Sequence, residues 1–330
     1  MSARPTISSV TPLRAVEGGH VTLRGAGFPV DQIPQVSIGG QPARVVFASG
    51  SRIVVTVPPD IEGGRAPIRI EDLPGETAYV SIGAAWATGL HQVDNPVFDA
   101  DGNLFVTYSG SRGQEAPVSI FRVTREGTRE PFVSGIVNAT SMTIGPDGRL
   151  YVSSRFEGAV YRVTPEGGHE LVVSDLGVAC GLAFGSDGCL YVGDRSGTIF
   201  RVRDGHAEQF ATLPPSVAAF HLAISPEGEL FVSGPTLATY DHVYRIGTDG
   251  GVRSLLAAFG RPQGLAFSPD EGVLHVVDAL AGRSGLYRVK DLDGEPELVV
   301  SGCDFIGVAF GPSGELAVAS NDTAYRFDEQ

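Results

Sequence analysis

The sequence lacks the features that mark several large classes of protein. Its 330 residues contain only three cysteines, Cys180, Cys189 and Cys303, with no CxxC pair, so neither a disulfide framework nor a cysteine zinc site is expected. No run of about 18 apolar residues could span a membrane, and no 3.6-residue helical pattern extends over a useful length. The start, MSARPTISSV, has no signal-peptide core. We therefore expect a cytoplasmic protein made of strands.

Positive charge is also scarce. The sequence has 24 Lys and Arg residues against 38 Asp and Glu residues, a net charge of −14 at pH 7. An acidic surface repels phosphate backbones and anionic lipids, so we expect neither nucleic acid nor a membrane as a partner. The sequence also has no serine nucleophile elbow, phosphate-binding loop or His-x-His cluster. A local basic patch remains compatible with this overall balance.

Glycine is abundant, and it marks a repeat. Segments such as GLAFGSDGCLYV recur six times, 40 to 46 residues apart, and each is followed by an FRV- or YRV-like segment. Four short strands in each period of about 40 residues are typical of a propeller blade. Asp-Gly pairs suit the tight turn between the first two strands, because glycine adopts positive φ freely. The turn glycines are Gly102, Gly148, Gly188, Gly228, Gly272 and Gly314.

The last repeat is incomplete. It ends at Phe327 without a fourth apolar segment, whereas residues 84–89 (AAWATG) precede the first repeat without a blade of their own. An unpaired outer edge invites aggregation, so we predict that residues 84–89 complete the last blade of a six-bladed propeller over residues 83–330. A chain cut near residue 80 should then stay folded, whereas one cut after residue 90 should not.

Residues 1–82 have a different pattern. Short alternating strands with Gly and Pro between them predict a small β-sandwich. The segments PTISSVTP, EGGHVTLRGAGF and VSIGG resemble the IPT/TIG domain. That resemblance implies an immunoglobulin-like fold used as a spacer, docking module or binding domain, and it brings no catalytic motif. The expected fold class is therefore all-β, an Ig-like sandwich followed by a six-bladed propeller.

The propeller repeats carry a second resemblance. GLAFGSDGCLYVGD and GLAFSPDEGVLHVVD are similar to the NHL and senescence-marker/gluconolactonase group. That group includes lactonases, other hydrolases, lyases and binding modules, so the fold leaves the function open. Its lactonases hold a divalent cation with a Glu before the first inner strand and an Asn before a middle one. Here Asp94 and Asn95 stand near the first position, and Cys180 replaces the Asn. Calcium or zinc would have Asp94 and Asn95 as candidate ligands, but we expect no firm metal site or other cofactor.

The loops that enter each inner strand and leave each second strand should share one mouth, which we call the funnel. Three of its residues are catalytic candidates: Asp94, His221 as a general base, and Cys180, which could act only with such a base. A small neutral thiol and a hydrogen-bonded histidine are the structural alternatives. The candidate ligand-binding residues are Asn95, Thr140, Arg155, Asp194, Arg195, Gln263, Asp278 and Asp304.

Arginines gather in the predicted exit loops of this acidic protein. Guanidinium groups bind carboxylates and phosphates through paired hydrogen bonds, whereas local pairing with Glu115, Glu157 and Asp194 is the structural alternative. The leading prediction is a propeller that binds a small anionic molecule, a protein or a peptide in the funnel. A divalent-metal lactonase or related hydrolase in the same funnel is the alternative. The exit-loop arginines are Arg112, Arg155, Arg195 and Arg283.

Overall fold

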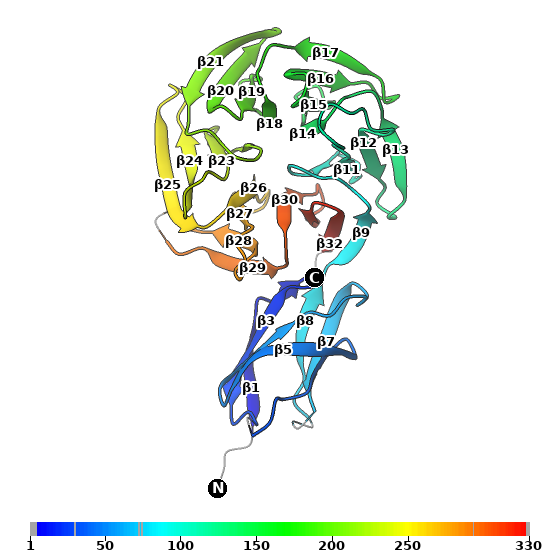
Figure 1. The fold of residues 1–330 in the computed structure, drawn as a ribbon, viewed down its shortest axis with the longest axis vertical. Helices are drawn as coiled ribbons and strands as arrows, with labels where there is room; N and C mark the ends of the chain where they lie inside the picture. The colour runs from blue at the N-terminus through cyan, green and yellow to red at the C-terminus, as the bar shows by residue number, and fades with distance from the viewer. Residues whose placement is uncertain (1–4, 30, 72, 74, 293, 328–330) are drawn as a thin grey trace.

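Strands make up all the regular structure of the described residues. The computed structural model describes residues 5–29, 31–71, 73, 75–292 and 294–327, and their elements run from β1 to β32 without a helix. Figure 1 shows an elongated N-terminal unit attached to the edge of a ring of small sheets. The expected all-β class, a sandwich followed by a propeller-like ring, is confirmed.

The N-terminal unit is a sandwich with an apolar centre. Strands β1, β3, β6 and β5 pair in that order, and β4, β7 and β8 form the facing layer. The alternation in RIVVT leaves Ile53 and Val55 fully buried, where they meet Leu23, Ile38 and Ile68. The strands are β1 (Thr6–Thr11), β2 (Arg14–Ala15), β3 (His20–Ala26), β4 (Val36–Ile38), β5 (Gln41–Ser49), β6 (Arg52–Thr56), β7 (Gly64–Ile70) and β8 (Ala78–Ile82).

The ring consists of four-strand antiparallel groups. Five groups are separate sheets, and β26–β29 form a further group that continues into the sandwich. The first three sheets are β10 (Val97–Phe98), β11 (Leu104–Thr107), β12 (Ile120–Val123) and β13 (Arg129–Val133); β14 (Ala139–Ile144), β15 (Leu150–Ser154), β16 (Ala159–Val163) and β17 (His169–Val173); and β18 (Ala179–Phe184), β19 (Leu190–Asp194), β20 (Thr198–Arg203) and β21 (His206–Thr212).

Three groups remain, and the last two of them lie next to the sandwich in Figure 1. They are β22 (His221–Ile224), β23 (Leu230–Ser233), β24 (Asp241–Ile246) and β25 (Val252–Phe259); β26 (Pro262–Phe267), β27 (Leu274–Asp278), β28 (Gly285–Val289) and β29 (Glu297–Ser301); and β30 (Phe305–Phe310), β31 (Leu316–Ser320), β32 (Thr323–Phe327) and β9 (Ala84–Thr88). In every group the strand that comes first in the repeat lies on the inside of the ring (Figure 1).

The repeated turns use glycine as the sequence indicates. All six turn glycines have positive φ, between 63° and 85°. The neighbouring acidic side chains cap the turns, since Asp147 and Asp187 each accept a backbone hydrogen bond of 3.1 Å. These acids therefore serve the turn, as the Asp-Gly pattern suggests.

The ring closes on a strand from before the first repeat. β9 pairs antiparallel with β32. Ala84–Thr88 therefore supply the fourth strand of the last group, which its own repeat lacks. Trp86 packs against Phe98 of the first group, with ring centroids 5.8 Å apart, and Arg326 lies 4.8 Å over the indole. This side chain thus joins the first and last groups of the ring.

The sandwich and the ring share one sheet. β2 pairs in parallel with β8 on one side and β29 on the other, which produces a 12-stranded sheet. Next to β2, Val16 is 1% exposed and packs in the core of the last two groups. The Tyr325 hydroxyl donates to Glu17 at 2.8 Å. A cut near residue 80 would therefore remove β2 and Val16 from the ring. The chain that is expected to stay folded after this cut should thus be less stable than the full chain.

We predict a graded effect of N-terminal truncation. A chain of residues 83–330 loses β2 and should melt at a lower temperature than the full chain. A chain of residues 91–330 also loses β9 and Trp86, which should lower the melting temperature by about 10 °C more, or abolish folding. Equal melting of the two truncated chains, measured by circular dichroism, would contradict the role given to β9.

Candidate functional site

A short polar segment before β10 enters the centre of the ring. Gln92 is fully buried, and its side-chain oxygen accepts from the backbone of Thr107 at 2.6 Å. Its side-chain nitrogen donates to the carbonyl of Asp94 at 3.3 Å. Asn321 donates to the Gln92 carbonyl at 2.8 Å. These bonds hold residues 92–95 in a fixed path. The sequence alone did not identify Gln92 as a site residue. The only signal was its position in the mostly polar segment HQVDN, residues 91–95.

Asn95 acts as a brace between two inner strands. Its side-chain nitrogen donates to the carbonyl of Leu265 in β26, and its oxygen accepts from the amide of Val308 in β30, both at 3.0 Å. A Cβ atom at Gly307 would lie 2.8 Å from the Asn95 backbone, so glycine is needed for this close approach. The Asn95 side chain is thus committed to backbone partners, and the funnel lining does not include it.

Asp94 meets His221 at the middle of the ring. The His221 Nδ1 atom lies 2.5 Å from Asp94 Oδ1, and its Nε2 atom lies 3.2 Å from the side-chain oxygen of Gln263. The side chains of His221 and Asp94 are 0% and 3% exposed. One ring nitrogen thus faces a carboxylate and the other faces a side-chain amide. Two catalytic candidates are therefore in direct contact.

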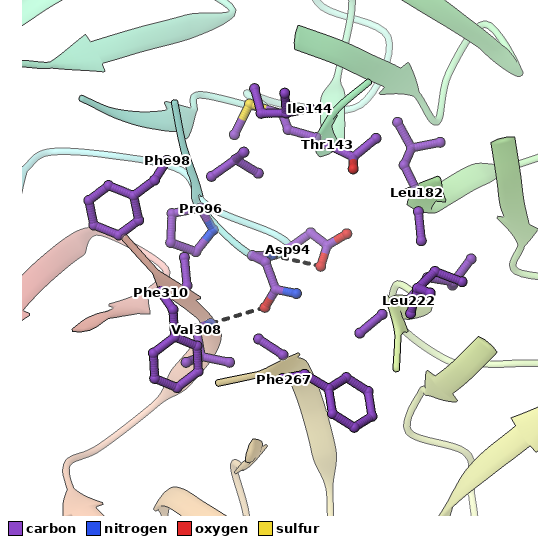
Figure 2. A pocket seen from close by; sticks show the side chains of 18 of the residues that line it. Asp94, Pro96, Phe98, Thr143, Ile144, Leu182, Leu222, Phe267, Val308 and Phe310 are labelled. Atoms are coloured by element: carbon purple, nitrogen blue, oxygen red, sulfur yellow. Dashed lines mark hydrogen bonds between the residues drawn. The ribbon is translucent and has the colours of Figure 1, made fainter. Parts of the chain in front are cut away.

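These three side chains separate two cavities along the ring axis. Gln263 lines a cavity of about 290 Å³ at the entry-loop end, which is the predicted funnel. Asp94 lines a cavity of about 540 Å³ at the other end, which we call the lower cavity (Figure 2). His221 lines neither. The funnel is lined by Val93, Thr140, Arg155, Cys180, Arg195, Val217, Ala218, Ala219, Gln263 and Ile306.

Positive charge gathers at the funnel. Burial lowers the pKa of Arg155, and the neighbouring charges of Arg195 and Arg112 lower it further. Burial, with Arg155 as a second cause, also lowers the pKa of His91. None of the acidic side chains that the structure describes forms an ion pair with Arg112, Arg155 or Arg195.

The arginines of the blade repeats behave differently. Those of the FRV and YRV segments reach an outer-strand glutamate, as in Arg122–Glu130 at 2.8 Å and Arg162–Glu170 at 2.7 Å. Arg283 lies 3.6 Å from Asp278. The funnel arginines do not pair with the nearby acids Glu157 and Asp194. Glu157 accepts a hydrogen bond from Tyr161 instead, and Asp194 accepts from Val178 and Ser196.

Three predicted ligand-binding acids lie away from the funnel lining. Asp194 accepts from the amide of Val178 at 2.8 Å. Asp278 accepts from the amides of Gly260 and Arg261 at 3.2 and 2.9 Å. Both acids are the last residue of a second strand and hold the entry loop of the same group. Asp304 is exposed, in a turn with φ of 54°. Of the predicted ligand-binding residues, the funnel brings together Thr140, Arg155, Arg195 and Gln263.

Cys180 lines the funnel as a protonated thiol. It is 1% exposed, and its sulfur donates to the carbonyl of Val178 at 3.3 Å. Burial raises the pKa of this thiol to about 12. Only about one thiol in ten thousand is then ionised at pH 8. A nucleophilic thiolate needs the opposite environment, so the geometry disfavours Cys180 as a catalytic group.

Most donor atoms of the candidate metal ligands already have protein partners. Asp94 Oδ1 accepts from His221 and from the Asn95 amide at 2.7 Å, and the Asn95 side chain bonds to two backbone groups. No cluster of three His, Cys, Asp or Glu residues that could hold a metal ion occurs in the described part of the chain. Calcium needs six to eight oxygen ligands, and Asp94 and Asn95 do not fit that requirement.

Comparison with known proteins identifies the N-terminal unit and the overall fold. Residues 5–72 match the IPT/TIG domain model. A search of curated proteins found no significant match. An auxiliary nutrient-binding protein from Bacteroides ovatus is 12% identical, with a TM-score of 0.56 over 99% of both chains. A gluconolactonase from Xanthomonas campestris is 15% identical, with a TM-score of 0.61 over 73% of this chain and 88% of its own.

Virginiamycin B lyase from Staphylococcus aureus has a similar fold as well. Its inactive variant, crystallised with quinupristin, is 14% identical, with a TM-score of 0.55 over 93% of this chain and 98% of its own. At these identities the likeness concerns the fold alone, since one propeller fold supports several different functions.

Among the described residues, no helix has the length and apolar character of a membrane span.

We predict that Cys180 resists alkylation in the native protein. Iodoacetamide at pH 8 should label the exposed Cys303 first, whereas Cys180 and Cys189, which are buried, should react only after denaturation. Peptide mass spectrometry over a time course measures this order. If Cys180 is labelled as fast as Cys303, Cys180 becomes a candidate nucleophile again.

Proposed function

We propose that the protein binds a small anionic molecule in the funnel. We also count β26–β29 as the fifth blade, since their four antiparallel strands follow the blade pattern, so that the propeller has six blades. On this proposal residues 83–330 form the propeller that binds the anionic molecule, and residues 1–82 form a second domain. Three free cysteines are compatible with the reducing cytoplasm.

The observation that carries the proposal is an arginine cluster without an ion pair in the described residues, in which Arg195 donates only to the carbonyl of Val217, at 3.2 Å. Arg112, Arg155 and Arg195 hold like charges close enough to lower the pKa of Arg155, in a protein with a net charge of −14. Such mutual repulsion destabilises the empty funnel, whereas a bound carboxylate or phosphate would relieve it and accept charge-assisted hydrogen bonds. Arginines elsewhere in the blades form ion pairs with glutamates, as in Arg122–Glu130 and Arg162–Glu170. Within the described residues, the funnel arginines thus lack ion pairs in a protein that is rich in acidic residues.

The rest of the funnel suits a ligand with an apolar portion. Val217 is 37% exposed and lines the cavity with Ala218, Ala219 and Ile306. Thr140 and Gln263 add polar groups at the base. Apolar walls with a few convergent polar groups are typical of small-molecule sites. The similarity of fold to a nutrient-binding protein over 99% of the chain supports binding of a small solute.

A hydrolase in the same funnel is the second candidate. The buried Asp94–His221 hydrogen bond is the observation that favours it, because a carboxylate that orients an imidazole is a common acid–base arrangement. Gln263 stands between His221 and the funnel. The imidazole could reach a substrate only if the Gln263 amide moved aside. The metal-dependent lactonase form of this candidate would also need ligands beyond Asp94 and Asn95.

We predict that inorganic phosphate or citrate raises the melting temperature of the protein. Arg155→Ala and Arg195→Ala should each weaken this stabilisation, with about a 10- to 100-fold loss of affinity per removed charge-assisted bond. The shift should shrink with added salt, because exposed charges are screened over about 8–10 Å. Thermal-shift titration at constant ionic strength measures the first effect, and its repetition at several NaCl concentrations measures the second.

Arg253→Ala is the matched control for this titration. Arg253 is exposed on the outer strand β25, away from the funnel, so its loss should leave the phosphate-induced shift unchanged. The proposal fails if no anion stabilises the wild-type protein, or if all three arginine variants behave alike.

We predict that the purified protein contains less than stoichiometric calcium or zinc. Elemental analysis after dialysis measures the content. About one metal ion per chain that is lost in Asp94→Ala, together with hydrolysis of an aldonolactone that depends on His221, would reverse the ranking in favour of the lactonase.

A further inference from the structure

We infer that the lower cavity is a second binding site, for a compact apolar molecule that carries one hydroxyl group. The site is independent of the funnel. It is formed by the inner strands at the end of the ring opposite the entry loops, and the hydroxyl would donate to Asp94 Oδ2 at its closed end.

The walls of the lower cavity are mostly apolar. Figure 2 shows side chains from successive groups of the ring directed toward one space. The cavity of about 540 Å³ falls within the range of small-molecule sites. Its apolar lining includes Phe98, Ile144, Leu182, Leu222, Phe267 and Phe310.

Asp94 supplies the polar group. Its Oδ1 atom accepts hydrogen bonds from His221 and from the amide of Asn95. Its Oδ2 atom has no hydrogen-bond partner within the described residues, although the side chain is 97% buried and lines the cavity. Figure 2 shows the carboxylate at the wall of this space. This oxygen is accessible from the cavity, since it is not among the fully buried side-chain atoms that lack a partner in the described residues. A ligand donor could therefore form a hydrogen bond to it.

The depth of the cavity follows the direction of the inner strands. Asp94, Ser141 and Leu182 line one end, and Ala100 and Pro312, which follow β10 and β30, line the other. From Asp94 to Ala100 an extended chain spans about 20 Å. The carboxylate is therefore at the inner end, and a ligand would enter from the turn end with its hydroxyl group first.

The apolar surroundings of Asp94 favour a neutral donor over a cation. His221 and the Asn95 amide already occupy Oδ1, so a ligand donor would bond to Oδ2. An ammonium group would lose most of its hydration in this space, which costs far more free energy than burial of a neutral hydroxyl group. A hydroxyl group donates the same hydrogen bond without that cost.

The test uses four naphthalene probes with the full-length protein. Naphthylmethanol can donate, naphthylmethyl methyl ether can only accept, methylnaphthalene has no polar group, and naphthylmethylamine is cationic. Fluorescence titration should give the alcohol an affinity about tenfold above the ether and the hydrocarbon, and the amine should bind more weakly than the alcohol. Equal affinities for alcohol, ether and hydrocarbon, or tightest binding of the amine, would overturn the inference.

Asp94→Asn tests the acceptor itself. The Asn95 amide and His221 both donate to Oδ1, so the introduced oxygen should stay there and the new amino group should take the Oδ2 position. That group can donate to an ether, so the preference for the alcohol should disappear or reverse. An unchanged preference in a folded variant would contradict the assignment.

Two further variants keep the inference testable if Asp94→Asn does not fold. Thr143→Phe fills the lower cavity from its wall and should abolish binding of naphthylmethanol (Figure 2). Arg155→Ala removes a funnel charge and should leave this binding unchanged. Loss of naphthylmethanol binding in Arg155→Ala, or its survival in Thr143→Phe, would place the probe in the funnel instead. Phosphate binding and alcohol binding can thus fail separately.

Discussion

The buried contact between Asp94 and His221 holds the centre of the ring in place. Removal of a carboxylate and an imidazole from water costs several kcal/mol, and it is offset only when further hydrogen bonds satisfy both groups. Here the Asn95 amide serves Asp94 and Gln263 serves His221. The two residues come from the segment before the first blade and from the fourth inner strand, so the contact spans the ring. It also forms the partition between the funnel and the lower cavity.

Much of the fold could be predicted because the repeat is periodic. The turn glycines and the incomplete last repeat were sufficient to indicate the propeller and the closing strand near Trp86. The shared sheet could not be predicted, because β2 is only two residues long and pairs with a strand almost 290 residues away. No local pattern records such a pairing. From the sequence, Arg14 and Ala15 were predicted only to be part of the sandwich.

The site was predicted in part, for reasons that differ between residues. Arg155 and Arg195 were identified because their loops occupy equivalent positions in neighbouring blades, and topology alone brings them together. Asp194 and Asp278 occupy equivalent positions at the ends of their strands, but they hold backbone amides. A single sequence cannot separate an acid that binds a ligand from one that caps a loop. The lower cavity was missed because strand residues that line it, such as Leu182 and Leu222, read as ordinary core.

The strand β2 determines how the two parts of the molecule can move. A flexible tether would let the IPT/TIG unit swing freely, but parallel pairing on both sides of β2 makes the sandwich an extension of the β26–β29 group. A molecule bound to the outer end of the sandwich would therefore be held at one distance and one angle from the funnel. The sandwich is in this respect a rigid arm, joined to the ring by the pairing of β2 with β29, by Val16 in the core and by the hydrogen bond between Tyr325 and Glu17.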